Sequence, residues 1–486
     1  MEKTIKHHVS TMRYIYLFAL LLVASCTQNR YSSIDHPSTI SPNSQLDRDI
    51  IAYIDQRLEE EYYWLDEVNE RGYMFERDTK KWSEYLPSAL SMLRTNGDDG
   101  YIKSNGQRAF YSYISEYEPT TRATTLGFGI MLHYTILSSG SQDNTYYFVV
   151  DHVYPSSPAA EAGIERGDLI TMVNDGYITS NNYSTLFNSI QANTKQSVTL
   201  ALYRQTTKES REVELTKGQY DANPVAHSEV IEVADMKIGY LVYTGFEGEY
   251  DEVLLDALRE FAADGVQEVI LDLRVNGGGS VNSAVKLCSA LMPQSLEGGT
   301  LCTLVRNPNN KRMAESSTFT LAETGAILSL DDLTVICSGY SASASELVIM
   351  GLRGLDVPVK LIGSQTEGKN CGMDVTRKSI GSKSLEFAPI TFMCFNAKGV
   401  GDWGEGIIPD IDLSSESNSL GVYDANYPMP RTAWGDMHYD IALAAALSHV
   451  TGKPLSQATR SETHFESFDS RYIDCPIEGI RVLVEE

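Results

Sequence analysis

The stretch Glu268-Val-Ile-Leu-Asp-Leu-Arg-Val-Asn-Gly-Gly-Gly279 decides the fold class of this sequence. Its first six residues form a short, mainly apolar run that is typical of a buried strand. The three glycines at its end let the backbone turn sharply and direct N–H groups towards a ligand. Residues 280–291 then follow with a helical pattern. The stretch therefore predicts a strand, a ligand-facing turn and a helix in succession.

The same order of elements recurs on both sides of this stretch. Further strands and helices are predicted at residues 237–243, 249–263, 333–337, 344–353 and 359–362. Alternation of strands and helices at this spacing indicates a sheet with helices on its faces. We therefore assign residues 219–450 to an α/β core and residues 451–486 to a C-terminal extension.

A helical region is predicted before the core. Apolar residues recur every four positions from Leu46 to Leu58, which predicts an amphipathic helix over residues 46–70. Further helices are expected at residues 82–93 and 110–117, with a break rich in Gly, Asp and Asn between them. Residues 46–120 are therefore expected to form an N-terminal helical region.

Residues 121–218 have a different character from the regions on either side. Short β-branched runs at residues 146–153, 197–203 and 211–215 alternate with turns, and one helical stretch lies near residues 183–191. This pattern indicates a small β-rich domain, so that the whole chain is predicted to be a multidomain α/β protein.

The first 45 residues predict export and anchoring rather than folded structure. Three basic residues precede the apolar run of residues 14–24, which is typical of a secretory signal over residues 1–25. The end of that run resembles the lipobox of bacterial lipoproteins, in which Cys26 is acylated. Residues 26–45 are rich in Ser, Pro, Asn and Thr and read as a flexible tether. We therefore expect a bacterial cell-envelope protein that faces the periplasm and is held at the membrane by lipid alone.

Composition limits the classes of partner. The chain has 486 residues, of which 42% are hydrophobic and 21% charged, and its formal net charge is −26. This length excludes a single small binding domain, and the acidic balance makes nucleic acid an unfavourable partner. No CxxC or His-rich spacing suggests a metal site, so we expect no metal and no cofactor.

Candidate catalytic groups follow the predicted core strands. The strand ending at Cys337 is followed by a serine-rich turn, Ser338 to Glu346, at the start of a helix, where amide dipoles favour a developing anion. The same residues also fit a capping box of Ser343 and Glu346, which needs no catalysis. No histidine lies in a turn after a core strand, so Lys369, which follows the strand at 359–362, is the candidate base. The alternative for Lys369 is an exposed loop lysine.

Four short motifs resemble those of the C-terminal processing peptidases, or tail-specific proteases. They are LDLRVNGGG (271–279), GYSASASE (339–346), TEGKN (366–370) and GEGIIPDI (404–411). The resemblance implies a ClpP/crotonase-like α/β catalytic core. It also implies Ser343 as nucleophile, Lys369 as base, and an oxyanion hole formed by the N–H groups of Gly278 and Ala344.

The β-rich region fits the PDZ domain that this family carries ahead of its core. Leu126-Gly127-Phe128-Gly129 resembles the loop that binds a peptide's C-terminal carboxylate, and residues 158–174 resemble the signature that follows it. The implied partners are protein or peptide substrates with free C-termini.

One position departs from the family pattern. Members often carry a Gln four residues after the Lys, where this chain has Met373. Gln365, Asp374 and Asp356 are alternative candidates for orienting Lys369.

The expected function is therefore a serine endopeptidase that captures unstructured C-terminal tails through its PDZ domain and cleaves them through an acyl-enzyme. The alternative is a catalytically weak or inactive lipoprotein of the same fold that binds peptide tails or apolar ligands. A crotonase-type acyl-chain enzyme is a third interpretation, but it requires neither the PDZ domain nor the Ser-Lys pair.

Overall fold

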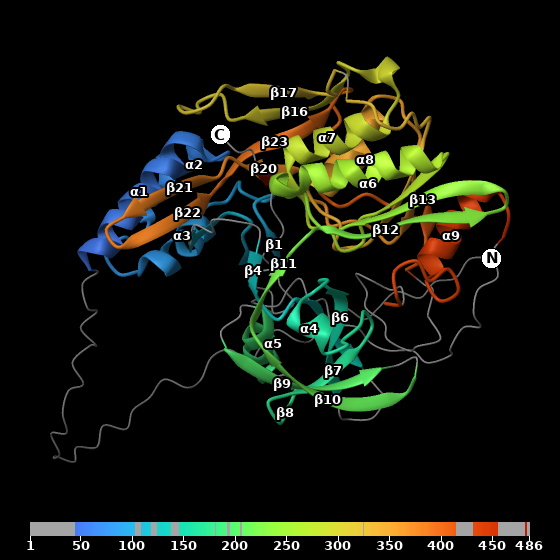
Figure 1. The fold of residues 1–486 in the computed structure, drawn as a ribbon. Helices are drawn as coiled ribbons and strands as arrows, with labels where there is room; N and C mark the ends of the chain where they lie inside the picture. The colour runs from blue at the N-terminus through green and yellow to red at the C-terminus, as the bar shows by residue number, and fades with distance from the viewer. Residues whose placement is uncertain are drawn as a thin grey trace, which may run out of the picture. The chain divides into compact units, whose positions relative to one another are not determined.

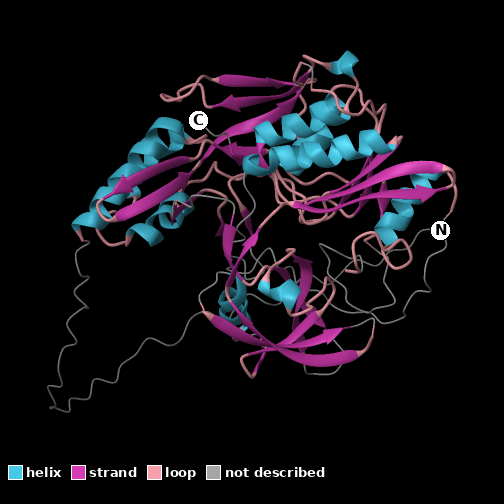
Figure 2. Cartoon of the chain, in the orientation of Figure 1, coloured by secondary structure: helices cyan, strands magenta, loops and turns pink. Residues whose placement is uncertain are grey.

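The computed structural model describes residues 44–102, 108–117, 124–137, 145–179, 181–191, 195–204, 207–323, 325–414, 431–454 and 482–483 (Figures 1 and 2). These residues all belong to one unit of the chain, Asn43–Glu486. The predicted signal, the tether up to residue 43 and the lipidation site Cys26 lie outside them. Within the described ranges, no helix combines the length and the hydropathy needed to cross a membrane.

The core is a six-stranded sheet in the order β12-β13-β14-β18-β19-β24. Its strands are β12 (Val225–Val233), β13 (Met236–Tyr243), β14 (Glu268–Asp272), β18 (Leu333–Cys337), β19 (Val359–Gly363) and β24 (Ile411–Asp412). Neighbouring strands from β13 to β24 are parallel, and β12 is antiparallel to β13. Every residue of β18 is buried, as expected for a parallel strand covered on both faces. The predicted α/β core is confirmed.

Helices cover the two faces of this sheet. Alternate residues such as Leu241 and Leu271 join one apolar cluster with α6 (Asp251–Asp264), α7 (Val281–Leu291) and α8 (Ala344–Gly354). The residues between them, such as Tyr240 and Ile270, join a second cluster with α9 (Ile441–Thr451) (Figure 1). Successive side chains of a strand point to opposite faces, so each strand supplies both clusters.

A second sheet was not anticipated from the sequence. It runs β15-β25-β20-β23-β16-β17 and borders the core. Its strands are β15 (Gly279–Ser280), β25 (Val482–Leu483), β20 (Cys371–Met373), β23 (Ile390–Asn396), β16 (Thr300–Arg306) and β17 (Ser316–Thr320). Leu304 and Phe392 of this sheet are buried in the same cluster as α8. The second sheet therefore backs α8, the helix that follows Ser343.

The N-terminal region is only partly helical. It forms α1 (Gln45–Glu61), α2 (Leu65–Arg71) and α3 (Trp82–Ser91), so the helix predicted over residues 46–70 is interrupted between α1 and α2.

The helix predicted at residues 110–117 is wrong. Tyr113–Glu116 forms strand β3, which pairs with β22 (Lys383–Ala388) of the hairpin that β22 makes with β21 (Thr376–Ile380). Ile114 lies opposite Phe387, and this long-range pairing overrides the local helical pattern.

The β-rich domain matches its prediction closely. Its main sheet contains β5 (Ile130–Leu137), β6 (Thr145–Val153), β7 (Leu169–Val173), β9 (Ser197–Arg204) and β10 (Glu209–Thr216), with the short strand β8 (Gly176–Tyr177) beside β7. Helices α4 (Pro158–Glu161) and α5 (Tyr183–Gln191) complete it around a separate apolar cluster. The entering and leaving segments, β4 (Thr124–Gly127) and β11 (Gly218–Asp221), pair with each other.

Candidate active site

Ser343 lies at a sharp turn between β18 and α8. Its φ is +61°, in the left-handed region that side-chain-bearing residues rarely adopt. Strain of this kind persists where the surrounding structure imposes it, and it concentrates at functional sites. The side chain is 2% exposed, and its Oγ makes no hydrogen bond within the described structure. The turn therefore holds a buried hydroxyl that is free to react.

The two neighbouring serines have structural partners instead. Ser341 Oγ donates to the Leu273 carbonyl at 2.7 Å, and Ser345 Oγ donates to the Asn276 carbonyl at 2.9 Å. Both bonds tie the serine-rich turn to the glycine-rich turn after β14. Of the three serines, the geometry therefore singles out Ser343 as the candidate nucleophile.

The predicted oxyanion donors are brought to the same place. A Cβ added to Gly278 would lie 2.7 Å from Ser343 Cβ and 3.0 Å from Ala344 N, so Gly278 has to be a glycine for the two turns to approach. Ala344 is the first residue of α8, where an N–H has no acceptor inside the helix. The Gly278 N–H, however, donates to Asn276 Oδ1 at 2.8 Å. In this structure Ala344 offers an open donor and Gly278 does not.

A buried charge network fixes the start of the glycine-rich turn. Arg274 is completely buried between Asp272 and Asp440, and its guanidinium contacts their carboxylates at 2.5 Å and 2.6 Å. Burial opposes ionisation of Asp440, but Arg274 holds the pKa of that carboxyl below its usual value. Ser338 Oγ donates to the Arg274 carbonyl at 2.5 Å, which joins this network to the serine-rich turn.

Lys369 lies in the loop that follows β19, as predicted. Its side chain is 2% exposed, so the exposed-loop alternative is wrong. Burial lowers the pKa of Lys369, because the ammonium form loses its hydration. Its Nζ lies 4.7 Å from the centre of the Tyr111 ring. Ser343 Oγ lacks a hydrogen-bond partner, so the structure does not join the nucleophile to Lys369.

Four other groups face Lys369 and oppose this effect of burial. They are the thiol of Cys371 and the carboxyl groups of Asp99, Glu367 and Glu346. Asp99 is itself fully buried and accepts hydrogen bonds from Tyr62 and Ser112 of the N-terminal region. The N-terminal region therefore contributes directly to the surroundings of the candidate base, which the sequence did not indicate.

The three residues suggested as substitutes for the family's Gln have other partners in the described structure. Gln365 Nε2 donates to the Glu405 carbonyl at 2.5 Å. Asp374 pairs with Arg306, and the exposed Asp356 pairs with Lys398.

Met373, at the position of that Gln, is fully buried in the N-terminal apolar cluster. A thioether there donates no hydrogen bond and is only a weak acceptor, so it is a poor substitute for an amide in orienting the Lys369 amine.

Glu346 links the nucleophile turn to the base loop. Its Oε2 accepts from the N–H groups of Ser343 at 2.8 Å and Lys369 at 2.9 Å. Its Oε1 accepts from Thr366 Oγ1 at 2.6 Å and the Gly368 N–H at 2.8 Å. Burial raises the pKa of Glu346 to about 7, while these four donors favour its ionised form. The sequence had assigned Glu346 only to a capping box.

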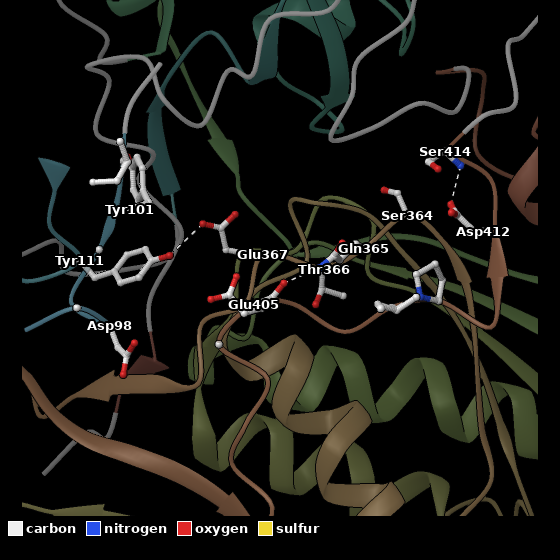
Figure 3. A pocket seen from close by; sticks show the side chains of 17 residues that line it. Asp98, Tyr101, Tyr111, Ser364, Gln365, Thr366, Glu367, Glu405, Asp412 and Ser414 are labelled. Atoms are coloured by element: carbon white, nitrogen blue, oxygen red, sulfur yellow. Dashed lines mark hydrogen bonds between the residues drawn. The ribbon is translucent and has the colours of Figure 1, made fainter. Parts of the chain in front are cut away.

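A cavity of about 850 Å³ lies beside the base loop (Figure 3). Residues 364–368 form one side, and Tyr101 and Tyr111 of the N-terminal region face them. The Tyr111 hydroxyl donates to Glu367 Oε1 at 3.0 Å across this space. The loop that carries Lys369 therefore lines this cavity with the five residues before the lysine.

The predicted carboxylate-binding loop lies where the chain enters the β-rich domain. Leu126 and Gly127 end β4, and Phe128 and Gly129 form the turn into β5. The carbonyls of Phe128 and Gly129 accept from Ala159 N and Tyr154 N, both at 3.0 Å.

The N–H groups of Phe128 and Gly129 make no hydrogen bond to other described residues. The Phe128 side chain is buried in the domain core and fixes the turn.

The described residues contain no group of three or more His, Cys, Asp or Glu side chains placed to hold a metal ion. Five cysteines fall within the described ranges, and all five are buried free thiols: Cys288, Cys302, Cys337, Cys371 and Cys394.

Two regions of the chain match the sequence models of known protein families. Residues 237–413 match the sequence model of peptidase family S41, and residues 149–204 match that of the PDZ domain. The core of the chain is therefore similar to the peptidases of family S41. The S41 match contains Gly278, Ser343 and Lys369, and the PDZ match begins after the predicted carboxylate-binding loop.

Two curated relatives are named CtpA-like serine proteases. The one from Staphylococcus aureus is 24% identical over 339 residues, which cover 70% of this chain and 64% of the relative. The one from Staphylococcus epidermidis is 22% identical over 345 residues, which cover 70% of this chain and 65% of the relative. The chain therefore spans just under two thirds of the length of these relatives.

A solved structure extends the comparison to the fold. It is that of an S41 protease homologue from Bacteroides fragilis, 25% identical to this chain, with a TM-score of 0.60. The similarity covers 82% of this chain and 97% of the homologue. The arrangement of PDZ domain, helices and mixed sheet is therefore that of an S41 peptidase.

Proposed function

We propose that the protein is a serine endopeptidase in which Ser343 is the nucleophile and Lys369 the general base. The observation that carries this proposal is the Ser343 hydroxyl, which is buried at a strained helix N-terminus and makes no hydrogen bond to any described residue. Glu346 binds the backbone of this turn and of the loop that holds the buried Lys369. A lysine that is neutral at working pH can accept a proton, and burial favours that form.

The proposed reaction forms and hydrolyses an acyl-enzyme. Lys369 Nζ takes the proton of Ser343 Oγ as the oxygen attacks the scissile carbonyl, and the resulting ammonium then protonates the leaving amine. Water releases the acyl group in the second half of the reaction. The Ala344 N–H at the start of α8 stabilises the oxyanion, and the Gly278 N–H joins it after leaving Asn276.

Substrate selection is proposed to begin at the PDZ domain. The Phe128 and Gly129 N–H groups, which lack acceptors among the described residues, would receive a C-terminal carboxylate, with Leu126 and Gly127 beside them. The ligands are therefore unstructured proteins or peptides with a free C-terminus. The test compares cleavage of one unstructured substrate with a free and an amidated C-terminus. Equal cleavage of both would show that the domain does not read tails.

The proposed location is the bacterial cell envelope, with a lipid on Cys26 as the anchor. The supporting feature is the signal-like leader that ends at this cysteine. Cys26→Ser should move the protein from the membrane to the soluble fraction without changing peptidase activity. An unmodified mature N-terminus at another residue, found by mass spectrometry, would contradict the anchor.

A binding protein of the same fold is the second candidate. Two observations favour it: Ser343 Oγ has no hydrogen bond to a base, and the Gly278 N–H is already engaged by Asn276. Incubation with an unstructured protein separates the two functions. Cleavage that Ser343→Ala abolishes supports the peptidase, whereas tail binding without cleavage supports the binding protein.

A further inference from the structure

Strand β25 lies between β15, which follows the glycine-rich turn, and β20, which follows the loop that carries Lys369. Val482 pairs with Gly279 and Leu483 with Ser280 of β15, in parallel. On its other edge Leu483 pairs with Met373 of β20, also in parallel. Residues 482–483 are therefore hydrogen-bonded into a sheet on both sides.

Both neighbouring strands begin next to the proposed active site. β15 starts directly after Gly278. A Cβ added to Gly278 would lie 2.7 Å from Ser343 Cβ. β20 starts two residues after Lys369. The backbone of β25 consequently runs between the glycine-rich turn beside the nucleophile and the strand that follows the base.

The space that β25 fills has the form of a single-strand slot. The outer edge of β15 is taken by Phe246, whose carbonyl accepts from Ser280 N at 2.8 Å, and the outer edge of β20 is taken by β23. Without β25, the inner edges of β15 and β20 would face each other across about 9.5 Å, two strand spacings. Unpaired strand edges bind extended peptides through main-chain hydrogen bonds.

We propose that residues 482–483 occupy the position of a substrate backbone and compete with peptide substrates for this slot. The sequence of the segment, Arg481-Val-Leu-Val-Glu-Glu486, contains two valines, a residue type that favours extended structure. Among the described residues, three residue pairs join β25 to its neighbours, and a longer peptide that fills the slot can form more pairs than these three. The inference rests on the proposed peptidase function, because the slot is the place where the peptidase would bind its substrate.

The test uses the full chain, a variant lacking residues 481–486, and Leu483→Pro, which removes a backbone N–H from β25. Leu483→Ala is the matched control, because it keeps that N–H. Deletion and Leu483→Pro should each lower KM for a peptide substrate by about threefold or more and leave kcat unchanged, as expected when an attached competitor is removed. Leu483→Ala should change KM less than the deletion or Leu483→Pro does. Unchanged KM in both altered chains would overturn the inference.

A labelled synthetic peptide of residues 478–486 separates this inference from the peptidase proposal. It should bind the deletion variant and inhibit it competitively, whereas the same peptide N-methylated at Leu483 should not. Binding of the first peptide alone, in a protein that cleaves nothing, would support the slot and contradict the peptidase. Equal binding of both peptides, or of neither, would overturn the slot. Leu483→Pro provides the same binding test in the full-length chain if the deletion variant does not fold.

Discussion

The carboxylate of Glu346 accepts a hydrogen bond from the backbone N–H of Lys369 at 2.9 Å, although the two residues are 23 positions apart in the chain. The same oxygen accepts the N–H of Ser343. One buried side chain thereby sets the relative position of the two turns that carry the proposed nucleophile and base.

Alanine substitution of each serine in the turn should separate chemistry from structure. Ser343→Ala should abolish cleavage and change the free energy of unfolding little, because its hydroxyl makes no hydrogen bond. Ser341→Ala and Ser345→Ala each remove a hydrogen bond to a buried carbonyl and should destabilise the protein by about 1–3 kcal/mol while retaining cleavage. Denaturant unfolding and a peptide cleavage assay measure the two effects. An active Ser343→Ala variant would exclude this residue as the nucleophile.

The pH profile should report the state of Lys369. Burial lowers the pKa of Lys369 below its ordinary value, and only the neutral amine can accept the serine proton. We expect kcat/KM to rise with pH and to level off well below about pH 10.4, the value for an exposed lysine. Lys369→Arg, which stays charged, should be as inactive as Lys369→Met. A rise that is centred near pH 10.4, or an active Arg variant, would contradict a desolvated lysine base.

Ionisation of Glu346 should act on activity and stability with opposite signs. Its pKa of about 7 lies above the ordinary glutamate value of 4.5, so the folded state binds more protons than the unfolded state between these pH values. The free energy of unfolding should therefore fall by about 3 kcal/mol as pH rises from 4.5 to 7, relative to a variant without this group. Activity should rise over the same range, because the ionised carboxylate accepts all four donors.

Glu346→Gln is the variant that tests this assignment, since it keeps the side-chain volume and cannot ionise. In this variant the free energy of unfolding should no longer fall between pH 4.5 and 7, and the activity should no longer rise near pH 7. Its cleavage rate should fall at all pH values, because an amide NH₂ would face backbone N–H groups. Wild-type pH dependence in this variant would show that another group titrates there.

Removal of Arg274 should destabilise the core more than removal of any single serine hydroxyl. Arg274→Met leaves the buried carboxylates of Asp272 and Asp440 without a counter-charge, at a cost of about 3–5 kcal/mol. Exposed Lys398, paired with exposed Asp356, provides the control, since Lys398→Met should cost less than about 1 kcal/mol. Equal losses of unfolding free energy in Arg274→Met and Lys398→Met, measured by urea unfolding, would contradict the structural role of the network.

The sequence predicted those elements whose pattern is local. The alternation of strands and helices from β13 to β19 follows from apolar runs and turns, and the structure brings together the turns that carry Ser343, Gly278 and Ala344. Long-range pairing was not accessible in this way. Strand β3 depends on β22, more than 250 residues later, and Asp440 meets Arg274 across 166 positions.

The role of Glu346 was hidden for a different reason. A Glu three residues after a Ser at a helix start is fully explained by capping, so the sequence gives no signal that its second oxygen reaches Thr366 and Gly368. Likewise, nothing in the local pattern indicates that Tyr111 covers Lys369.

The most direct test of the account is covalent labelling of the nucleophile. The full-length protein is treated with a fluorophosphonate near the pH of maximal cleavage, and the modified peptide is located by mass spectrometry. The account predicts one adduct, on Ser343, that forms much more slowly in Lys369→Met and not at all in Ser343→Ala. An adduct on Ser341 or Ser345, or equally fast labelling in Lys369→Met, would contradict the assignment of Ser343 and Lys369 as the catalytic pair.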